Sequence, residues 1–288
     1  MNSKEKINLL YCGDKNIGDG LLISLLSFMK NNSCPLNVYV LTLSFEYEGN
    51  SCEALSREYA EYLDRLLKED NPESSLTLID VSDKFIKELP LSNLRTRFTP
   101  GCMLRLYADE IEELPSKILY LDNDTICRKD VSDFYFQSID GKEVVGVLDH
   151  YGSHFFRRRV LKRDYLNSGV LLLNLGKIKD TGLFRKCRRL CAEKEMFMPD
   201  QSAINKLAVA KGYVPRHYNE QRKLRKKTVI QHFTTHFRMF PYIHTVTAKP
   251  WQIDRVHRVL KIKEYDGLFE EYERIKKCYE ITSKGERL

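Results

Sequence analysis

The sequence lacks any apolar run that approaches the roughly 20 residues needed for a membrane-spanning helix. It opens with charged and polar residues and reaches Gly13 and Asp14 after one short apolar stretch, so we expect neither a signal peptide nor an anchor helix. Its 288 residues suffice for one large α/β domain or two small ones, with a sizeable core.

Paired cysteines are also missing. The eight cysteines are scattered, without a C-x-x-C motif or the spacing of a disulfide framework. Cys187 and Cys191 share a helix face in the pattern, but no further ligands accompany them, so we expect them to pack rather than to bind zinc. This usage predicts a reducing compartment, the cytoplasm.

Two nucleotide-binding fingerprints are absent. Gly13, Gly18 and Gly20 do not form G-x-G-x-x-G, and no phosphate-loop Gly-Lys-Ser/Thr occurs, which argues against a Rossmann dehydrogenase and a P-loop enzyme. The apolar segment 7–12 is instead followed by a polar turn at 13–16 and an amphipathic pattern at 21–29. That order is typical of the start of a nucleotide-binding α/β unit.

Positive charge is concentrated in a few places. The formal net charge is +7, and basic residues cluster at 157–159, 162–163, 185–189 and 216–227. Such clusters bind nucleic acid, anionic lipid or phosphorylated substrates, or they form a solvated surface. No nucleic-acid-binding module accompanies them, so we expect no nucleic-acid partner.

Apolar segments of strand length alternate with helical patterns along the chain. Further strands are predicted at 38–43, 76–81, 118–121, 144–148, 170–175 and 229–233, and helices at 52–68, 102–114 and from 199 onward. This alternation predicts a mostly parallel sheet covered by helices. Segment 265–279 forms either a helix that packs back on the domain or a basic amphipathic surface helix.

The most informative stretch is the strand at 118–121 with the three residues that follow it, Asp122, Asn123 and Asp124. In an open α/β sheet ligands bind at the carboxyl ends of strands, and two carboxylates one residue apart can converge there on one hard cation. Asp and Asn are equally the residues of an ordinary turn. The stretch alone indicates either a divalent-metal site or a turn.

Other polar residues are ambiguous when taken singly. Arg105 lies among apolar residues and either pairs with an internal carboxylate or faces a ligand's phosphate or hydroxyl groups. Asn167 is more typical of a turn than of a ligand contact, and an N-cap role would account for Asp200. His232 is more often structural than a ligand, although Mn²⁺ accepts one imidazole beside carboxylates. His236 and His244 lie close by in the sequence and keep the choice open.

Taken in order, these segments resemble glycosyltransferase family 8, the retaining enzymes that include glycogenin and bacterial lipopolysaccharide galactosyl- and glucosyltransferases. The resemblance runs from residue 7 to about residue 251 and rests on six short matches in sequence. They are Gly13-Asp14-Lys15-Asn16, Arg105-Leu106-Tyr107, Leu119-Tyr120-Leu121-Asp122-Asn123-Asp124, Asn167-Ser168-Gly169-Val170-Leu171-Leu172-Leu173-Asn174, Asp200-Gln201, and His232-Phe233 with Lys249-Pro250-Trp251.

The resemblance implies an α/β GT-A fold, Rossmann-like, with helices on both faces of a mostly parallel sheet. It implies a catalytic domain at 1–251, divided near residue 130 into a nucleotide-sugar part and an acceptor-side part, and a helical tail at 252–288. It also implies a UDP-hexose donor and Mn²⁺, with Mg²⁺ as the alternative. By match to the motifs, the metal ligands would be Asp122, Asp124 and His232; the donor-binding residues Asp14, Asn16, Arg105, Asn123, Asn167 and Lys249; and the catalytic residues Gln201, Asp200 and Asp149.

One departure from the family pattern is the longer segment between His232 and Lys249. It makes His244, which is nearer to the Lys-Pro-Trp motif, the alternative third ligand. It also indicates a different lid over the donor, so the identity of the donor sugar does not carry over.

A sugar that leaves a diphosphate develops negative charge on a phosphate oxygen, which a cation and Lys249 stabilise without a protonated acid. The enzymes that the chain resembles retain the anomeric configuration. We therefore expect a short-lived oxocarbenium-like ion pair stabilised by Gln201, with a covalent intermediate on Asp200 as the less favoured route.

We expect a metal-dependent retaining hexosyltransferase that moves glucose or galactose from UDP to a cell-surface glycan or a lipid-linked acceptor. We place it in the cytoplasm, with peripheral contact to the anionic inner membrane through its basic clusters and tail. The alternatives are a glycogenin-like or protein-directed glucosyltransferase, and a non-catalytic protein that binds nucleotide sugars or nucleic acid. The sequence is compatible with a monomer and with a homo-oligomer.

Overall fold

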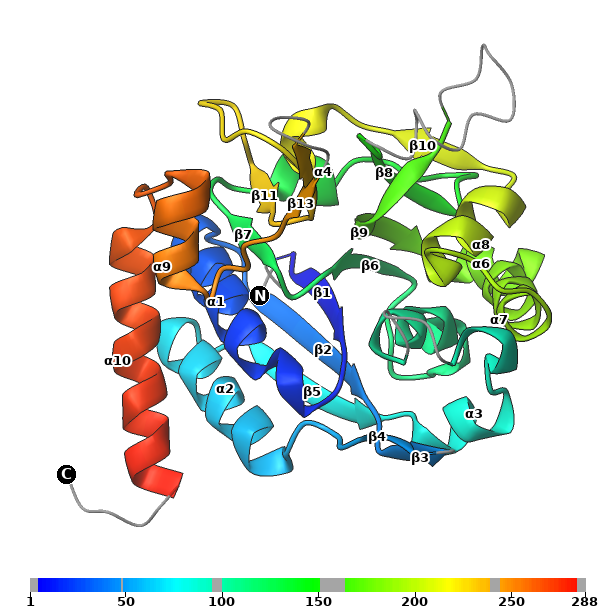
Figure 1. Cartoon of the computed structure of the whole chain (residues 1–288), viewed down its shortest axis with the longest axis horizontal. Coiled ribbons are helices and arrows are strands. Elements are labelled where there is room, and N and C mark those ends of the chain that lie inside the picture. The colour runs from blue at the N-terminus through cyan, green and yellow to red at the C-terminus, as the bar shows by residue number, and fades with distance from the viewer. Residues whose placement is uncertain (1–4, 48, 95–99, 151–163, 239–243, 284–288) are drawn as a thin grey trace.

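A seven-stranded sheet organises the chain. The computed structural model describes residues 5–47, 49–94, 100–150, 164–238 and 244–283 (Figure 1). The strand order across the sheet is β10-β8-β9-β6-β1-β2-β5. These strands are β1 (Ile7–Cys12), β2 (Leu36–Thr42), β5 (Ser75–Asp80), β6 (Lys117–Leu121), β8 (Val144–Leu148), β9 (Leu166–Asn174) and β10 (Lys211–Tyr213).

All neighbouring strands of this sheet run parallel except β9, which is antiparallel to both β6 and β8. The prediction of a mostly parallel sheet is therefore confirmed. The reversal of β9 has a consequence for the site, because its amino end lies beside the carboxyl ends of its neighbours. Val170 pairs with Leu121 at the end of β6, and Leu166 pairs with Leu148 at the end of β8.

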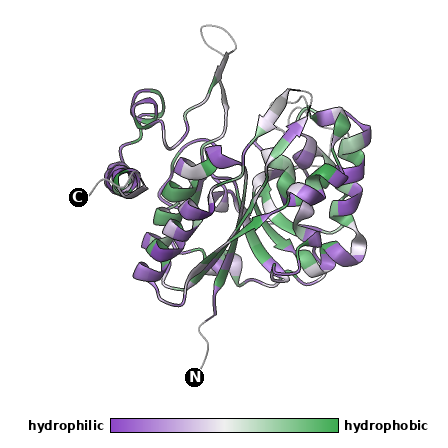
Figure 2. Ribbon diagram, turned by 90° about the horizontal axis from the view of Figure 1, so that it is seen from below, coloured by the Kyte–Doolittle hydropathy of each residue, from purple (hydrophilic) through white to green (hydrophobic). Residues whose placement is uncertain are grey.

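Helices cover both faces of the sheet, as Figure 2 shows with the strands seen between two helical layers. Side chains along β1 alternate between the two faces of the sheet and so belong to two hydrophobic cores. Leu9 and Tyr11 pack in the first core, and Leu10 and Cys12 pack in the second. The first core is covered by α1 (Gly18–Asn31), α2 (Arg57–Asp70) and α10 (Asp266–Ser283). The second is covered by α3 (Ser82–Lys87), the 3₁₀ helix η3 (Gly101–Glu110), α6 (Leu175–Thr181), α7 (Leu183–Glu193) and α8 (Pro199–Leu207).

Short elements complete the described chain. Three two-stranded ribbons pair β3 (Phe45–Tyr47) with β4 (Asn50–Cys52), β7 (Thr125–Cys127) with β11 (Ile230–His232), and β12 (His236–Arg238) with β13 (His244–Val246). The short helices are η1 (Lys15–Ile17), η2 (Leu91–Asn93), α4 (Ser132–Tyr135), η4 (Arg216–Tyr218), α9 (Ile253–Arg255) and the π-helix η5 (Val256–Leu260).

Two predicted helices differ from the structure. The helix expected at 52–68 begins at Arg57, because Ser56 caps it by accepting a hydrogen bond from the Tyr59 amide and Cys52 lies in β4. The helix expected at 102–114 is the shorter 3₁₀ helix η3. Arg105 Nε donates to the carbonyl oxygen of Cys102, three residues earlier, at 3.0 Å.

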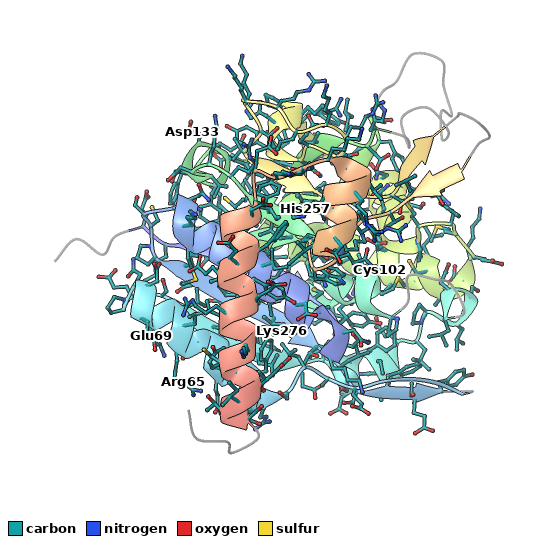
Figure 3. All side chains as sticks on the ribbon, turned by 60° about the vertical axis from the view of Figure 1, so that its left-hand side comes forward. Arg65, Glu69, Cys102, Asp133, His257 and Lys276 are labelled. Atoms are coloured by element: carbon teal, nitrogen blue, oxygen red, sulfur yellow. The ribbon has the colours of Figure 1, made fainter. Side chains whose placement is uncertain are left out.

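The C-terminal helix packs back on the domain, the first of the two alternatives considered for it. Figure 3 shows α10 lying over α1 and α2. Phe269 and Tyr272 are buried, Tyr279 contacts the ring of Tyr59 at 4.8 Å, and Lys276 pairs with Asp19 at 2.7 Å. The apolar face of α10 is therefore used inside the protein, and shallow insertion of that face into a membrane is ruled out as long as the helix stays packed.

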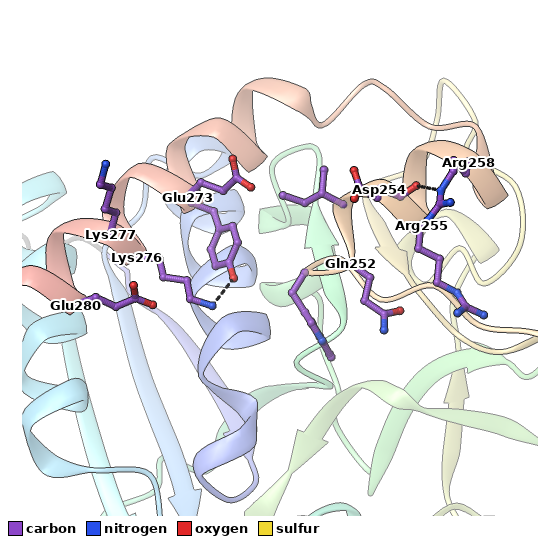
Figure 4. Close-up of a pocket in the computed structure, with 11 residues that line it drawn as sticks. Gln252, Asp254, Arg255, Arg258, Glu273, Lys276, Lys277 and Glu280 are labelled. Carbon is purple, nitrogen blue, oxygen red and sulfur yellow. Dashed lines mark hydrogen bonds between the residues drawn. The ribbon is translucent and has the colours of Figure 1, made fainter.

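An open groove lies between α10 and the α9–η5 segment (Figure 4), with a volume of about 850 Å³. Its walls carry charges of both signs, including Arg255 and Lys277 beside Glu273 and Glu280. These mixed charges favour neither an anionic nor a cationic ligand.

Within the described residues, none of the helices has the length and apolar character to cross a membrane.

Candidate active site

Asp122 and Asp124 leave the carboxyl end of β6 together. The backbone turns at Asn123 and Asp124 before β7 begins, and the Thr125 hydroxyl donates to the Asp122 carbonyl oxygen at 2.8 Å. The Asp122 amide in turn donates to the Gly169 carbonyl oxygen at 2.8 Å, which ties the turn to β9. The two interpretations of this stretch are thus compatible, because a turn brings both carboxylates to one place.

His232 joins the two carboxylates because β11 pairs with β7, which sets His232 opposite Thr125. Its Nε2 lies 3.1 Å from Asp124 Oδ1 and 3.5 Å from Asp122 Oδ2. One potential ligand atom from each of the three residues lies within 4.8 Å of the other two. Among the described residues, these three side chains are therefore close enough together to hold one metal ion. His244 begins β13, at the edge of the described residues, and its side chain lies outside what the structure describes.

The donor set fits a divalent cation. Asp124 Oδ1 is buried and lacks a well-aligned hydrogen bond, although His232 Nε2 lies 3.1 Å away, so a cation would complete its surroundings. Space is reserved beside it: a Cβ at Gly169 would lie 2.1 Å from His232 Cε1 and 2.6 Å from Asp122 Oδ2. Two hard oxygen ligands and one imidazole nitrogen are the mixture that Mn²⁺ accepts.

The charges of the cluster are strongly coupled. Burial disfavours a charged carboxylate, but Arg105 and His232 outweigh burial at Asp122 and lower its pKa. At Asp124 burial is outweighed by Lys249 and His232, so its pKa is also lowered. Burial would lower the pKa of His232, but the carboxylates of Asp124 and Asp122 raise it to about 9. A divalent cation at this point would replace the proton on His232.

Arg105 pairs internally, the first of the two alternatives considered for it. Its guanidinium is 3% exposed, donates to Asp122 Oδ1 at 2.8 Å, and lies 3.9 Å above the centre of the Tyr120 ring. Its Nε lies 3.4 Å from Asp200 Oδ2. Arg105 therefore links the metal-ligand side of the site to α8, and a contact from it to the donor stays a prediction.

Asp200 is not the N-cap of α8. Met198 occupies that position without a side-chain hydrogen bond, and Pro199 is the first helical residue. Asp200 lies in the first turn, buried, with Oδ2 facing Arg105 and lacking a hydrogen bond. The N-cap explanation is thus wrong, and Asp200 is a buried carboxylate at the site.

Asn167, Gln201 and Asp149 form a buried polar cluster. Asn167 lies inside β9 rather than in a turn, because the strand begins four residues earlier than its apolar run suggested. Its Nδ2 donates to Asp149 Oδ2 at 2.8 Å. The Gln201 side-chain oxygen accepts from the Ser168 amide at 2.9 Å, and its Nε2 lies 3.4 Å from Asp149 Oδ2. The three predicted residues are therefore brought together, at the amino end of β9.

The remaining predicted donor residues border the same sheet edge. Asp14 and Asn16 follow β1, the parallel neighbour of β6, and Asp14 Oδ1 accepts from the Asn16 amide at 2.9 Å. Asn123 is half-buried between the two carboxylates. Lys249 Nζ bonds Asp124 Oδ2 and the Phe233 carbonyl oxygen, the latter at 3.1 Å.

Trp251 anchors the segment that carries Lys249. A Cβ at Gly20 would lie 2.7 Å from the Trp251 ring and 2.5 Å from the Asn123 carbonyl oxygen. The glycine at the start of α1 therefore lets the Lys-Pro-Trp segment and the acidic turn approach each other.

Sequence reasoning missed Asn219 and Gln221. Both are buried and hydrogen-bonded to the site, although they lie in the tract 216–227, whose most evident sequence feature is its positive charge. Glu220 between them pairs with Arg216 at 2.5 Å and lies 3.6 Å from Arg225. The pattern that could have found them is an acidic and amide triplet inside a basic tract.

The other basic clusters divide in two. Arg188 is 2% exposed at its side chain and pairs with Glu88, Asp109 and Glu110, so it holds η3 against α7 rather than binding a ligand. The clusters at 157–159 and 162–163 lie outside the described residues.

Known proteins share this chain's sequence pattern. The sequence profile of Glycosyl transferase family 8 matches residues 8–254. The chain is 27% identical over 231 residues to a lipopolysaccharide 1,2-glucosyltransferase of Escherichia coli (strain K12), which covers 76% of this chain and 63% of that protein. It is 24% identical over 265 residues to a lipopolysaccharide 1,3-galactosyltransferase of Salmonella typhimurium (strain LT2), covering 86% and 73%. The chain thus spans less than two thirds of the Escherichia coli protein's length.

Solved structures share the fold. An active-site mutant of LgtC superposes with a TM-score of 0.62 at 16% identity, covering 95% of this chain and 96% of that chain. GlyE of Streptococcus pneumoniae TIGR4 gives a TM-score of 0.60 at 16% identity, covering 93% and 63%. These likenesses confirm the GT-A fold that the motifs implied. Because the family profile spans most of the sequence, this chain belongs to glycosyl transferase family 8.

Proposed function

We propose that the protein is a metal-dependent retaining hexosyltransferase. It would move glucose or galactose from a UDP-sugar to a hydroxyl group of a cell-surface glycan or a lipid-linked acceptor. The lipopolysaccharide glucosyl- and galactosyltransferases among its relatives support this acceptor class. The observation that carries the proposal is the convergence of Asp122, Asp124 and His232 at the carboxyl edge of the sheet.

In this proposal the three ligands hold Mn²⁺ or Mg²⁺, and the bound cation would neutralise the donor's diphosphate. Lys249 lies next to Asp124 and adds a second positive charge for the leaving phosphate. Asp14, Asn16 and Asn123 would bind the nucleoside and phosphates, because they border the same edge as the metal ligands. Donor binding by residues 1–130 and acceptor binding by residues 131–251 remain part of the proposal.

The buried cluster would hold the sugar. Asp149 and Asn167 offer a carboxylate and an amide to its hydroxyl groups, and the Gln201 oxygen would stabilise positive charge on the sugar. The bond from the anomeric carbon to the phosphate breaks, and the acceptor oxygen attacks from the same face. The acceptor's proton passes to the departing phosphate, so configuration is retained. Asp200 lies beside Arg105, and this pairing weakens it as a nucleophile.

A cytoplasmic location belongs to the same proposal, since the donors are nucleotide sugars. Contact with an anionic membrane would depend on surface charge alone, because the apolar face of α10 is buried.

The test is UDP release and product analysis with UDP-glucose or UDP-galactose, Mn²⁺ and truncated lipopolysaccharide as acceptor. We expect metal-dependent UDP release, an α-linked product by NMR, and a loss of at least tenfold in kcat for Gln201→Ala. Gln137→Ala, two residues after the end of α4, is the control and should match the wild type. A product of inverted configuration would overturn the retaining mechanism, and hexose added to the protein itself would favour a protein-directed enzyme.

A further inference from the structure

Asn219 lies behind the metal ligand His232 and has no assigned role. It follows η4, is fully buried, and its side chain reaches two different parts of the site. Its Oδ1 lies 3.2 Å from His232 Nδ1, and its Nδ2 donates to Asn167 Oδ1 at 2.9 Å. One amide thus touches the metal side and the sugar side of the site.

Hydrogen bonds connect His232 through Asn219 and Asn167 to Asp149. The direction of each bond in this series follows from the carboxylate of Asp149 at its end. Asp149 is a carboxylate and accepts only, so Asn167 must present its NH₂ group to it. Asn167 Oδ1 then faces Asn219 and also accepts from the Gly169 amide at 3.0 Å. Asn219 must therefore donate with its own NH₂ group, which turns its oxygen toward the imidazole.

An amide oxygen accepts only, so His232 must carry a proton on Nδ1. The nitrogen that stays available to a metal is Nε2, the atom that faces Asp122 and Asp124. Hydrogen bonds of this kind fix the tautomer and the ring orientation of histidines that bind metals.

Asn219 is itself held in place from two sides. The Glu220 amide donates to the Ile230 carbonyl oxygen at 2.9 Å, and the His232 amide donates to the Glu220 carbonyl oxygen at 3.1 Å. Gln221 accepts from the His150 amide at 2.9 Å and donates to the Leu148 carbonyl oxygen at 3.3 Å. The segment therefore joins β11, which carries His232, to the end of β8, next to Asp149.

We propose that Asn219 is a positioning residue that fixes His232 as a ligand through Nε2 and couples it to the Asn167 and Asp149 pair. The inference rests on the proposed function for the identity of the ligands. It goes beyond that function by making metal binding and sugar binding depend on one buried amide.

The first test is the tautomer of His232 in the wild-type protein loaded with Zn²⁺, a diamagnetic cation that accepts imidazole, read by long-range ¹H–¹⁵N NMR. We expect the Nδ1–H form, whereas free histidine favours Nε2–H. Finding Nε2–H on His232 would overturn the inference whether or not the protein transfers sugar.

The second test compares variants by Mn²⁺ titration with EPR and by calorimetry with UDP-glucose. Asn219→Ala should weaken Mn²⁺ binding about ten- to a hundredfold. Asn219→Asp keeps an acceptor for Nδ1, so Mn²⁺ affinity should stay within a few-fold, but the lost donor to Asn167 should weaken UDP-glucose binding. Asn93→Ala removes another buried amide, which bonds the Cys191 and Lys194 carbonyl oxygens far from His232, and should leave Mn²⁺ affinity unchanged.

Equal losses of Mn²⁺ affinity in Asn219→Ala and Asn93→Ala would contradict the inference, because general destabilisation would then explain both. If the wild type binds Mn²⁺ but transfers no hexose, the proposed function fails while the tautomer and the Mn²⁺ comparison still decide the role of Asn219. If Asn219→Ala does not fold, the NMR result and Asn219→Asp carry the test.

Discussion

At the scale of the residue, the site is a set of buried charges that depend on one another. Two carboxylates at the end of β6 are met by Arg105, Lys249 and a histidine, each from a different part of the chain. No single member of this set would be stable where it lies without the others, because isolated buried charges are costly. The positive side chains therefore offset the carboxylates within the cluster. A divalent cation can be accommodated there when His232 gives up its proton.

Mn²⁺ binding should depend on pH through His232. Its pKa is raised to about 9 from 6.5, so a metal must displace a proton at neutral pH. Affinity should rise about tenfold per pH unit between roughly pH 6.5 and 8.5 and level off above 9. The stability of the metal-free protein should change with pH in the opposite direction. The protonated imidazole contributes fully to the unfolding free energy below pH 6.5, and this contribution is lost as pH rises through about 9. EPR of free Mn²⁺, without nucleotide, measures the affinity, and a pH-independent value would exclude His232 as a ligand.

Gly169 should be intolerant of any side chain. A Cβ there would lie 2.1 Å from His232 Cε1, closer than any real contact, so Gly169→Ala must displace the imidazole. We expect loss of Mn²⁺ binding and a cost of about 1–3 kcal/mol in unfolding free energy. Gly176→Ala is the matched control, since its Cβ would lie 3.5 Å from Asn174 Oδ1, an ordinary contact. Normal Mn²⁺ binding by Gly169→Ala would place the metal elsewhere.

At the scale of the element, most strands could be predicted from the sequence because each is a short apolar run bounded by polar residues. The direction of β9 could not, since a strand buried on both faces has the same pattern whichever way it runs. That direction is what places Asn167 beside Asp149 and close to the candidate metal ligands.

Only part of the candidate site could be predicted from the sequence. Its acidic turn, Gln201 and Lys249 lie in recognisable motifs, whereas Asn219 meets partners 13 and 52 residues away and stands in a tract dominated by charge. The triplet at 219–221 could have singled out Asn219, but its partners depend on tertiary structure and cannot be predicted from the local sequence. The sequence cannot decide between the two environments of Arg105 for the same reason, since its carboxylate partners come from the end of β6 and from α8.

The element η3 should depend on Arg188, which pairs with Glu88, Asp109 and Glu110. Arg188→Met leaves these carboxylates unpaired and should cost about 2–3 kcal/mol, less than the 3–5 kcal/mol of a fully buried pair because two of the acids are partly exposed. Its neighbour Arg189 is 81% exposed and pairs with Glu193 on the surface, so Arg189→Met should cost under about 1 kcal/mol. Urea unfolding gives both values, and equal values would show that the Arg188 network contributes no more than a surface pair.

At the scale of the whole molecule, two cores on opposite faces of one sheet leave its carboxyl edge free for chemistry. The C-terminal helix belongs to the first core, together with α1 and α2. It therefore stabilises the face from which α1 meets the acidic turn through Gly20.

Removing a core side chain from α10 should therefore destabilise the whole protein. Phe269 is 2% exposed, and Phe269→Ala should cost about 3–5 kcal/mol in a single unfolding transition. Phe197 is 70% exposed, and Phe197→Ala should change stability by no more than about 0.5 kcal/mol. Separate unfolding of α10, seen as an early transition that Phe269→Ala removes, would contradict a shared core.

The central claim is that the acidic turn and His232 hold a divalent metal that binds a nucleotide sugar. Calorimetric titration of UDP, UDP-glucose and UDP-galactose, with Mn²⁺ and with chelator, tests it in the wild type, Asp124→Asn and Asp133→Asn. Asp133 is an exposed residue of α4 and serves as the control (Figure 3). The account predicts Mn²⁺-dependent binding that is lost in Asp124→Asn and kept in Asp133→Asn, with the tighter sugar naming the donor. Equal binding in chelator, or in Asp124→Asn, would contradict it.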